Sequence, residues 1–188
     1  MRNSILLITL ILLFSSCMKR NFFPDEDDPG LSRLTFYGYN IATNYINDVP
    51  YINPFRGSWR GNSLPTLKRI STSSDFDTLR LSWPIERNDA SDMSLSPFND
   101  ISLLTPISKS FTIYDFIALA GKRFSSNTNT VILNSNEDFG LANLYFIKIT
   151  DDGKYLTFSG LFDGHMADGI LITKGRFDFR ISVNNINF

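Results

Sequence analysis

The only histidine of the chain, His165, lies in the segment Asp163-Gly164-His165-Met166-Ala167-Asp168-Gly169. An imidazole next to a carboxylate can act as a general base, and Asp163 or Asp168 could orient it. Aspartate and glycine are also the residue types that a turn between two strands requires. No G-x-S-x-G pattern supplies a nucleophile. We therefore expect a loop at this position, no catalytic residue and no enzymatic activity.

Oxygen-bearing side chains cluster at residues 25–28, which read Asp-Glu-Asp-Asp, and at residues 134–138, which read Asn-Ser-Asn-Glu-Asp. Such side chains can bind Ca²⁺, but neither cluster has the ligand spacing of an EF-hand. The single histidine and single cysteine make a zinc site of the usual kind improbable. We expect solvated loops at both clusters, with no metal site and no cofactor.

Aromatic residues in the N-terminal half offer a different chemistry, because flat rings beside amide side chains can contact sugar faces or peptides. The candidate ligand contacts are Tyr37 and Tyr39, which we expect on one face of a strand, and Trp59, which we expect in a loop. The alternative is that these rings only pack, because aromatic residues favour strands for packing reasons alone. The aromatic set of this half is Tyr37, Tyr39, Tyr45, Tyr51, Trp59 and Trp83.

The elements that must position these residues have the period of β-strands. In residues 176–183, apolar Phe177, Phe179, Ile181 and Val183 alternate with polar side chains. Because successive strand residues point to opposite faces, this pattern predicts a half-buried strand. The same reasoning predicts further strands at 34–41, 51–55, 67–70, 78–83, 100–104, 131–133, 144–150, 154–162 and 170–173.

One segment has a helical period. Ile113, Phe116, Ile117 and Ala120 are spaced as one face of a helix, with Thr112 as a candidate N-cap. Turns with Asp-Gly and Lys-Gly join the C-terminal strands into an antiparallel meander. We therefore predict an all-β domain, either an antiparallel β-sandwich or a partly closed barrel, with one short helix near 113–120.

The N-terminus has the features of a targeting segment. An arginine and a ten-residue apolar run precede small residues, which is typical of a signal peptide over residues 1–16. The run is shorter than the roughly 20 residues of a membrane-spanning helix. Residues 13–17, Leu-Phe-Ser-Ser-Cys, resemble the bacterial lipobox, which implies cleavage before Cys17, the only cysteine, and its lipidation with acyl chains such as palmitate. The alternative is an ordinary signal peptide with a chance cysteine.

Beyond the proposed anchor, residues 17–30 contain two prolines and four clustered acids, which favours a flexible acidic tether before a single β domain over 31–188. Met18 follows the cysteine. By the sorting rule of enteric lipoproteins, the absence of an aspartate there implies the outer membrane, on either its periplasmic or its surface side. The formal net charge of −1 gives no reason to expect nucleic acid as a partner.

The C-terminal strands resemble small lipoproteins of the Bacteroidetes. The similarity lies in residues 146–150 (Phe-Ile-Lys-Ile-Thr), 157–162 (Thr-Phe-Ser-Gly-Leu-Phe) and 172–178 (Ile-Thr-Lys-Gly-Arg-Phe-Asp), and covers about residues 144–183. The resemblance implies an all-β fold in which Gly160 and Gly175 serve turns or bulges. It implies no catalytic residue.

The function expected from the sequence is that of an outer-membrane or cell-surface lipoprotein, held to the membrane by its lipid anchor. We expect a non-enzymatic module that binds a glycan or a protein. The alternatives are a structural or assembly subunit of an envelope complex, or a hydrolase without a recognisable motif.

Overall fold

The structure is a computed structural model that describes residues 24–53, 64–71, 75–88, 98–127, 129–133, 138–186 and 188. Cys17, Trp59 and residues 1–16, which we expect to form a signal peptide, lie outside these residues. In the described part of the chain, no helix is long and apolar enough to cross a membrane.

The described strands form one 11-stranded sheet in the order β3-β4-β6-β8-β9-β10-β11-β1-β2-β5, with β7 paired to β9. Neighbouring strands run antiparallel. The strands are β1 (Ile41–Ile46), β2 (Val49–Ile52), β3 (Thr66–Ser71), β4 (Asp77–Pro84), β5 (Glu86–Arg87), β6 (Asp100–Ile107), β7 (Arg123–Phe124), β8 (Thr130–Leu133), β9 (Asp138–Asp151), β10 (Tyr155–Met166) and β11 (Leu171–Ser182).

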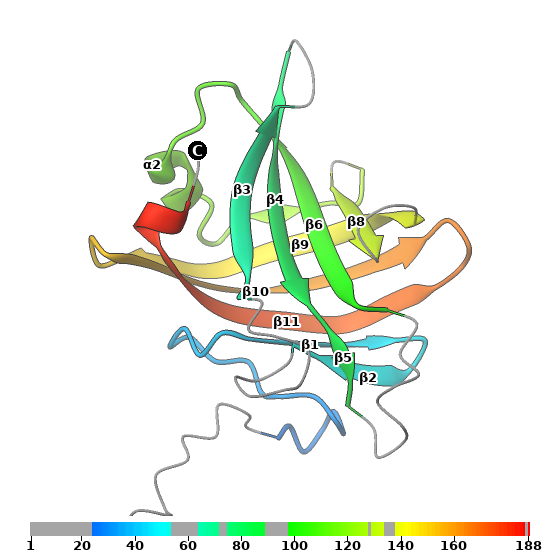
Figure 1. The fold of residues 1–188 in the computed structure, drawn as a ribbon. Helices are drawn as coiled ribbons and strands as arrows, with labels where there is room; N and C mark the ends of the chain where they lie inside the picture. Colours follow the sequence, from blue (N-terminus) through cyan, green and yellow to red (C-terminus); the bar gives the residue numbers. More distant parts are fainter. Residues whose placement is uncertain are drawn as a thin grey trace, which may run out of the picture.

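The sheet curls strongly, so that β3, β4 and β6 cross over the long strands β9, β10 and β11 (Figure 1). One chain segment takes part in both ends of the strand order, because β4 pairs with β3 and β6 while β5, two residues later, pairs with β2. The antiparallel all-β prediction is therefore confirmed, and the sheet has the form of a half-barrel.

The concave side of the sheet holds the core, as the alternating pattern predicts. Phe177 and Phe179 of β11 are almost fully buried and stack on each other, with ring centroids 5.6 Å apart. Trp83 of β4 packs against both from the opposite wall, at 6.2 and 5.3 Å. Since each large aromatic side chain removes much apolar surface from water, this cluster is the main source of stability.

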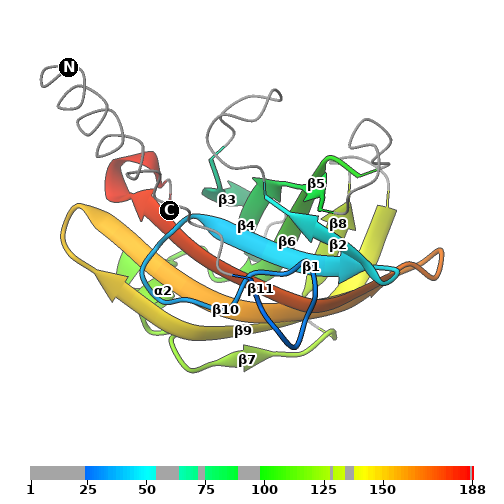
Figure 2. The same ribbon diagram turned by 90° about the horizontal axis from the view of Figure 1, so that it is seen from below.

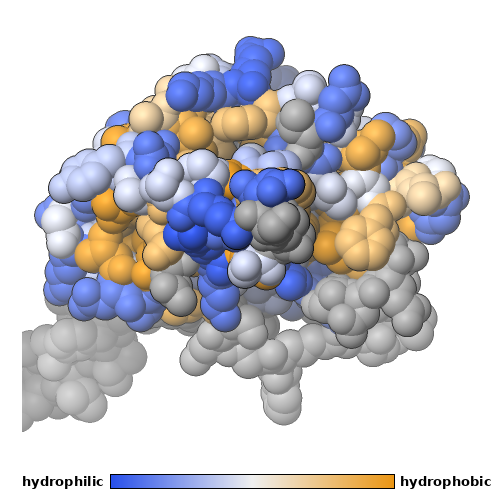
Figure 3. All heavy atoms as spheres, turned by 90° about the horizontal axis from the view of Figure 1, so that it is seen from above, coloured by the Kyte–Doolittle hydropathy of each residue, from blue (hydrophilic) through white to orange (hydrophobic). Residues whose placement is uncertain are grey.

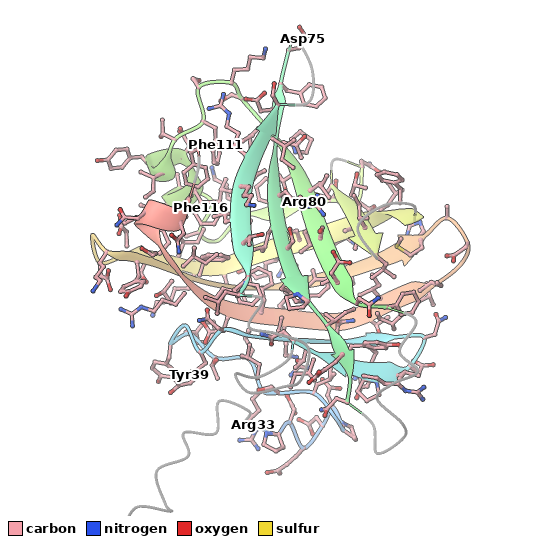
Figure 4. The ribbon with its side chains drawn as sticks, in the orientation of Figure 1. Arg33, Tyr39, Asp75, Arg80, Phe111 and Phe116 are labelled. Atoms are coloured by element: carbon pink, nitrogen blue, oxygen red, sulfur yellow. The ribbon has the colours of Figure 1, made fainter. Side chains whose placement is uncertain are left out.

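A short helix, α2 (Ile113–Ile117), closes one end of the half-barrel. The Thr112 hydroxyl accepts a hydrogen bond from the Asp115 backbone N–H, and the Asp115 carboxylate accepts one from the Thr112 N–H, which forms a capping box. Phe116 then inserts between the Phe146 and Phe158 rings at 5.5 and 5.3 Å. Figure 4 shows Phe116 and Phe111 together at this end. The predicted short helix is confirmed, although it ends at Ile117.

Two glycines that the resemblance assigns to turns or bulges lie inside strands, where the backbones approach closely. A Cβ at Gly160 would lie 2.3 Å from the Tyr145 carbonyl oxygen, and one at Gly175 would lie 2.5 Å from the Phe162 carbonyl oxygen. Gly160 also marks an irregularity in the β9–β10 register. These positions therefore require glycine because no side chain fits.

Two expected boundaries differ from the structure. The strand expected at 34–41 begins only at Ile41, and residues 34–40 form a loop. The loop expected at 163–169 is shorter, because β10 continues to Met166 and His165 lies within it, opposite Leu141 of β9. In both cases pairing with a distant strand decides the outcome, and local residue types do not report that pairing.

Candidate functional site

The centre of the site is Asp178, which lies on the convex side of β11 and is fully buried beneath the loop of residues 35–39. Its carboxylate accepts a hydrogen bond from the Thr35 hydroxyl at 2.5 Å. It also accepts hydrogen bonds from three backbone N–H groups, those of Tyr37 at 3.1 Å, Gly38 at 2.8 Å and Tyr39 at 3.3 Å. A buried carboxylate is stable only when its oxygens are satisfied, so the loop and the aspartate require each other.

Gly38 allows the loop to lie directly on the sheet. Its φ angle is +71°, a conformation that other residues rarely adopt, and a Cβ there would lie 2.7 Å from the Arg180 Cβ and 3.1 Å from Thr157. Thr157 and Arg180 are register partners on β10 and β11. The loop is therefore fixed over two defined strands.

The result is an exposed pair of tyrosines on a rigid support. Tyr37 is 72% exposed, and its ring centroid lies 5.6 Å from that of the half-buried Tyr39, with the planes tilted by 45°. Figure 4 places Tyr39 on the lower side of the molecule, below β11. The structure thus brings together both candidate tyrosines, but on a loop, whereas the sequence placed them on a strand.

A cleft of about 620 Å³ opens beside this loop, at the end of β11. Asn40 links the two features, because its side-chain oxygen accepts a hydrogen bond from the Arg180 backbone N–H at 2.7 Å. The cleft is lined by Asn40, Leu64, Pro65, Thr66, Tyr155, Arg180, Ile181, Ser182 and Asn185. Rings, amides and hydroxyls therefore converge on one concave surface.

The Arg180 guanidinium supplies the positive charge of the cleft. It lies 4.3 Å from the centroid of the Tyr155 ring and 3.0 Å from a carboxylate oxygen of Asp152. Backbone N–H groups of Tyr155 and Lys154, followed by Arg180 itself, lower the pKa of the Asp152 carboxyl, which stays ionised. Because this pair is exposed, it orients the guanidinium and contributes little to stability.

Chemically, the cleft can bind ligand oxygens with its amide and guanidinium groups, and the tyrosines of the adjoining loop can stack on a flat ligand face. Among the described residues, no group of three histidine, cysteine, aspartate or glutamate side chains could hold a metal ion. The site has the features of a binding surface.

A second hollow, of about 430 Å³, lies on the outer face of β9 and β10. The Arg123 guanidinium stands 4.5 Å from the Tyr145 ring centroid, and the Asn143 amide donates to Asp163 at 2.7 Å. The first cleft combines the Arg180 guanidinium with amide and hydroxyl groups, and it adjoins the loop that carries Tyr37 and Tyr39. We therefore take the first cleft as the candidate site.

The acidic run at 25–28 is not a solvated tether over its described part. Arg176 of β11 pairs with Asp25 at 2.5 Å and with Asp28, and also donates to the Ser32 carbonyl at 3.2 Å. Lys174 pairs with Asp28 as well. We call the ion pairs of Asp25 and Asp28 with Arg176 and Lys174 the clasp. The flexible tether over residues 17–30 stays a prediction, but the acids of its described part are held by cations that lie about 150 residues further along the chain.

The clasp makes the attachment of residues 24–32 sensitive to acid. Hydrogen bonds from Arg176 and Lys174 lower the pKa values of Asp25 and Asp28 below the ordinary 3.8, and Asp28 raises the pKa of Lys174. A carboxylate with a lowered pKa stabilises the folded form above its unfolded pKa, and that contribution is lost as the pH falls through the folded value. We expect the clasp to weaken as the pH falls below 3.8 and to open as the pH passes through the lowered pKa values of Asp25 and Asp28.

This expectation is checked by limited proteolysis between pH 3 and 7 with a protease active in acid, since an open clasp exposes residues 24–32 to cleavage. Arg176→Gln, which removes the charge that holds both acids, should be cut there at neutral pH. Equal cleavage of the wild-type chain at both ends of this range would contradict the clasp.

The remaining sequence candidates have ordinary structural roles. His165 is exposed, while the two aspartates proposed to orient it bond elsewhere: Asp163 to Asn143, and Asp168 to the Ile170 backbone N–H at 3.2 Å. Most of the second oxygen cluster, residues 134–137, lies outside the described residues. The sequence therefore led to the two tyrosines, whereas the structure adds Asn40, Tyr155, Asp178 and Arg180.

One signal could have identified Asp178. It stands between Phe177 and Phe179, on the face that the alternation assigns to solvent, and an aspartate in the middle of a strand is unfavourable without a partner. The glycine between Tyr37 and Tyr39 is a second signal, because glycine weakens a strand.

No protein-family model, curated protein or solved structure matches the chain.

Proposed function

We propose that this protein is a lipid-anchored protein of the bacterial cell envelope that binds a glycan, without catalysis, in the cleft beside Tyr37 and Tyr39. The observation that carries the proposal is the loop held by Asp178. Four hydrogen bonds to one buried carboxylate fix a loop whose outermost side chain, Tyr37, is 72% exposed. A rigid, exposed aromatic side chain binds with little loss of conformational entropy.

The polar lining favours a sugar over an apolar ligand. Asn40, Arg180 and Ser182 bring amide, guanidinium and hydroxyl groups to the lining of the cleft, and Tyr39 directly precedes Asn40 in the chain. Sugar rings offer an apolar face for stacking and hydroxyls that can both donate and accept hydrogen bonds. A peptide is the alternative ligand, because the same groups can bind backbone amides.

The anchor rests on the sequence. Cys17 ends a segment that resembles the lipobox, and the C-terminal strands resemble small Bacteroidetes lipoproteins. Acyl chains on Cys17 would hold the domain at the outer membrane, on its periplasmic or surface side. Each buried CH₂ contributes about 0.8 kcal/mol, so several chains on one residue give a firm attachment.

Replacing Cys17 by alanine should release the protein from the membrane, because the sulfur and the new N-terminus that carry the acyl chains are lost. In fractionated cells, the wild-type protein is expected in the membrane pellet after a high-salt wash and the variant in the soluble fraction. Ser16→Ala, next to the cleavage site, is the matched control and should stay in the pellet. A Cys17→Ala protein that remains membrane-bound would contradict the anchor. Protease treatment of intact cells then tells the surface from the periplasmic side.

A further inference from the structure

The convex face of the long strands carries an exposed apolar patch. Phe139 and Leu141 of β9, Leu161 of β10 and Leu171 of β11 are 58%, 45%, 40% and 52% exposed. We call these four residues the outer patch. Strand register places Leu141 and Leu171 on either side of His165, in one row across the three strands. Phe139 lies two positions from Leu141 on β9, and Leu161 lies four positions from His165 on β10, beyond Asp163.

Figure 3, which views the molecule from above, shows hydrophobic residues in several areas with hydrophilic ones between them. The outer patch instead gathers four large apolar side chains on adjacent strands. Such a gathering on a folded domain marks a surface that contacts a membrane or another molecule.

The clasp brings the start of the described chain to the edge of this patch. Leu161 is the register partner of Arg176, which holds Asp25 and Asp28. Figure 2 shows the N-terminal segment, in dark blue, lying across β11 beside β1 on this convex side. The chain therefore reaches the domain next to the outer patch.

The length of chain before this point limits the distance to the anchor. Only six residues lie between Cys17 and Pro24, and the seven extended steps from one to the other span at most about 25 Å. A domain of this size has a radius of gyration of about 15 Å, and hence a diameter of about 40 Å. The tether is thus too short for the domain to turn its opposite face to the bilayer.

We propose that the outer patch rests on the bilayer into which the acyl chains of Cys17 insert. This inference depends on the lipid anchor proposed above. The leucine and phenylalanine side chains enter the interfacial region of the lipid, while Asp163 and His165, which lie among them, stay at headgroup level. The clasp acts as the hinge that holds this face towards the membrane.

This orientation keeps the candidate binding site away from the lipid. Arg180 in the cleft lies nine positions along β11 from Leu171 in the patch, which corresponds to up to about 30 Å of strand. The Leu141 and Leu171 end of the patch and the cleft thus lie at opposite ends of the same strands. With that end on the bilayer, the cleft lies at the far end of β11, and the loop of residues 35–39, on the same convex face, covers β11 at Asp178, seven positions along from Leu171.

The test places a fluorescent label on the patch of the lipidated full-length protein. Because the sulfur of Cys17 is acylated, a cysteine introduced by Phe139→Cys or Leu171→Cys is the only free thiol and takes a thiol-reactive, environment-sensitive dye. Tyr114→Cys on α2, where the side chain is 78% exposed, is the matched control. The labelled proteins are reconstituted into phosphatidylethanolamine–phosphatidylglycerol vesicles with and without brominated acyl chains.

Bromine quenches only dyes that reach the lipid, so we expect positions 139 and 171 to lose about half of their fluorescence and position 114 to lose little. Equal quenching at all three positions, or none at 139 and 171, overturns the inference while leaving the anchor intact. Shielding from aqueous iodide without quenching by bromine also overturns it, since a protein then covers the patch. If mass spectrometry finds no acyl chains on Cys17, the anchor and this inference fail together.

Discussion

Replacing Asp178 by alanine is expected to lower the free energy of unfolding by about 3–5 kcal/mol, because it removes a buried charged acceptor and leaves its donors unpaired. Three backbone N–H groups and the Thr35 hydroxyl would lose their partner at once. Asp178→Asn keeps the shape and one acceptor oxygen, so its loss should be smaller. Urea unfolding followed by intrinsic fluorescence measures both values.

The same variants should change hydrogen exchange locally. The amides of Tyr37, Gly38 and Tyr39 are expected to exchange slowly in the wild-type protein and fast in both variants, because the carboxylate protects them. Asp163→Asn is the matched control, since Asp163 is exposed and accepts a hydrogen bond from one side chain; it should stay within about 0.5 kcal/mol of wild type. An Asp178→Ala protein as stable as that control would show that the carboxylate does not hold the loop.

Replacing Phe177 by alanine should have an effect of similar size on the core. Its ring touches those of Trp83, Phe162, Phe179 and two further phenylalanines, at centroid distances from 5.6 to 6.3 Å, and it is 1% exposed. Truncation removes apolar burial and leaves a cavity in closely packed surroundings, so we expect a loss of about 3–5 kcal/mol.

Chemical denaturation and thermal melting both report this change. Phe177→Leu, which keeps most of the volume, is expected to lose about 1–2 kcal/mol. Phe139→Ala, the same chemical change at an exposed position of the outer patch, should lose no more than about 0.5 kcal/mol. Similar losses for Phe177→Ala and Phe139→Ala would mean that Phe177 is not central to the core.

The local features of the fold were accessible from the sequence. Alternation at 176–183 and 78–83 predicts strands whose apolar faces form the core, and the Thr112–Asp115 spacing predicts the capped helix. The Asp151-Asp152-Gly153 turn is also as expected, with Gly153 at φ +80° and its N–H bonded to Asp151 at 2.7 Å. These features depend on neighbours within a few residues, so a single sequence contains the information.

The distant pairings were not accessible in the same way. Residues 35–39 alternate like a strand, but Gly38 at a positive φ and the carboxylate of Asp178, about 140 residues away, hold them as a loop. The acidic run at 25–28 resembles a solvated tether until Arg176 pairs with it. The curl of the sheet likewise follows from β4 and β5 joining its two ends. In each case the deciding contact joins residues that local patterns cannot connect.

Some residues of the candidate site could be identified from the sequence, whereas others depend on contacts between distant residues. Tyr37 and Tyr39 were identified from residue type alone, because few other side chains offer a flat ring with a polar tip. Arg180 and Tyr155 were not, since their importance comes from the cleft that the curled sheet forms at the end of β11. The site thus depends on the same long-range contacts as the fold.

Binding to a glycan array tests the central claim most directly, with wild-type protein and Tyr37→Ala measured side by side at neutral pH. Tyr114→Ala is the control, because Tyr114 is similarly exposed but lies on α2, away from the cleft. We predict that the wild-type protein and the control bind the same subset of glycans, and that Tyr37→Ala loses about tenfold or more in affinity for that subset. No binding by the wild-type protein, or equal binding by Tyr37→Ala, would contradict the account.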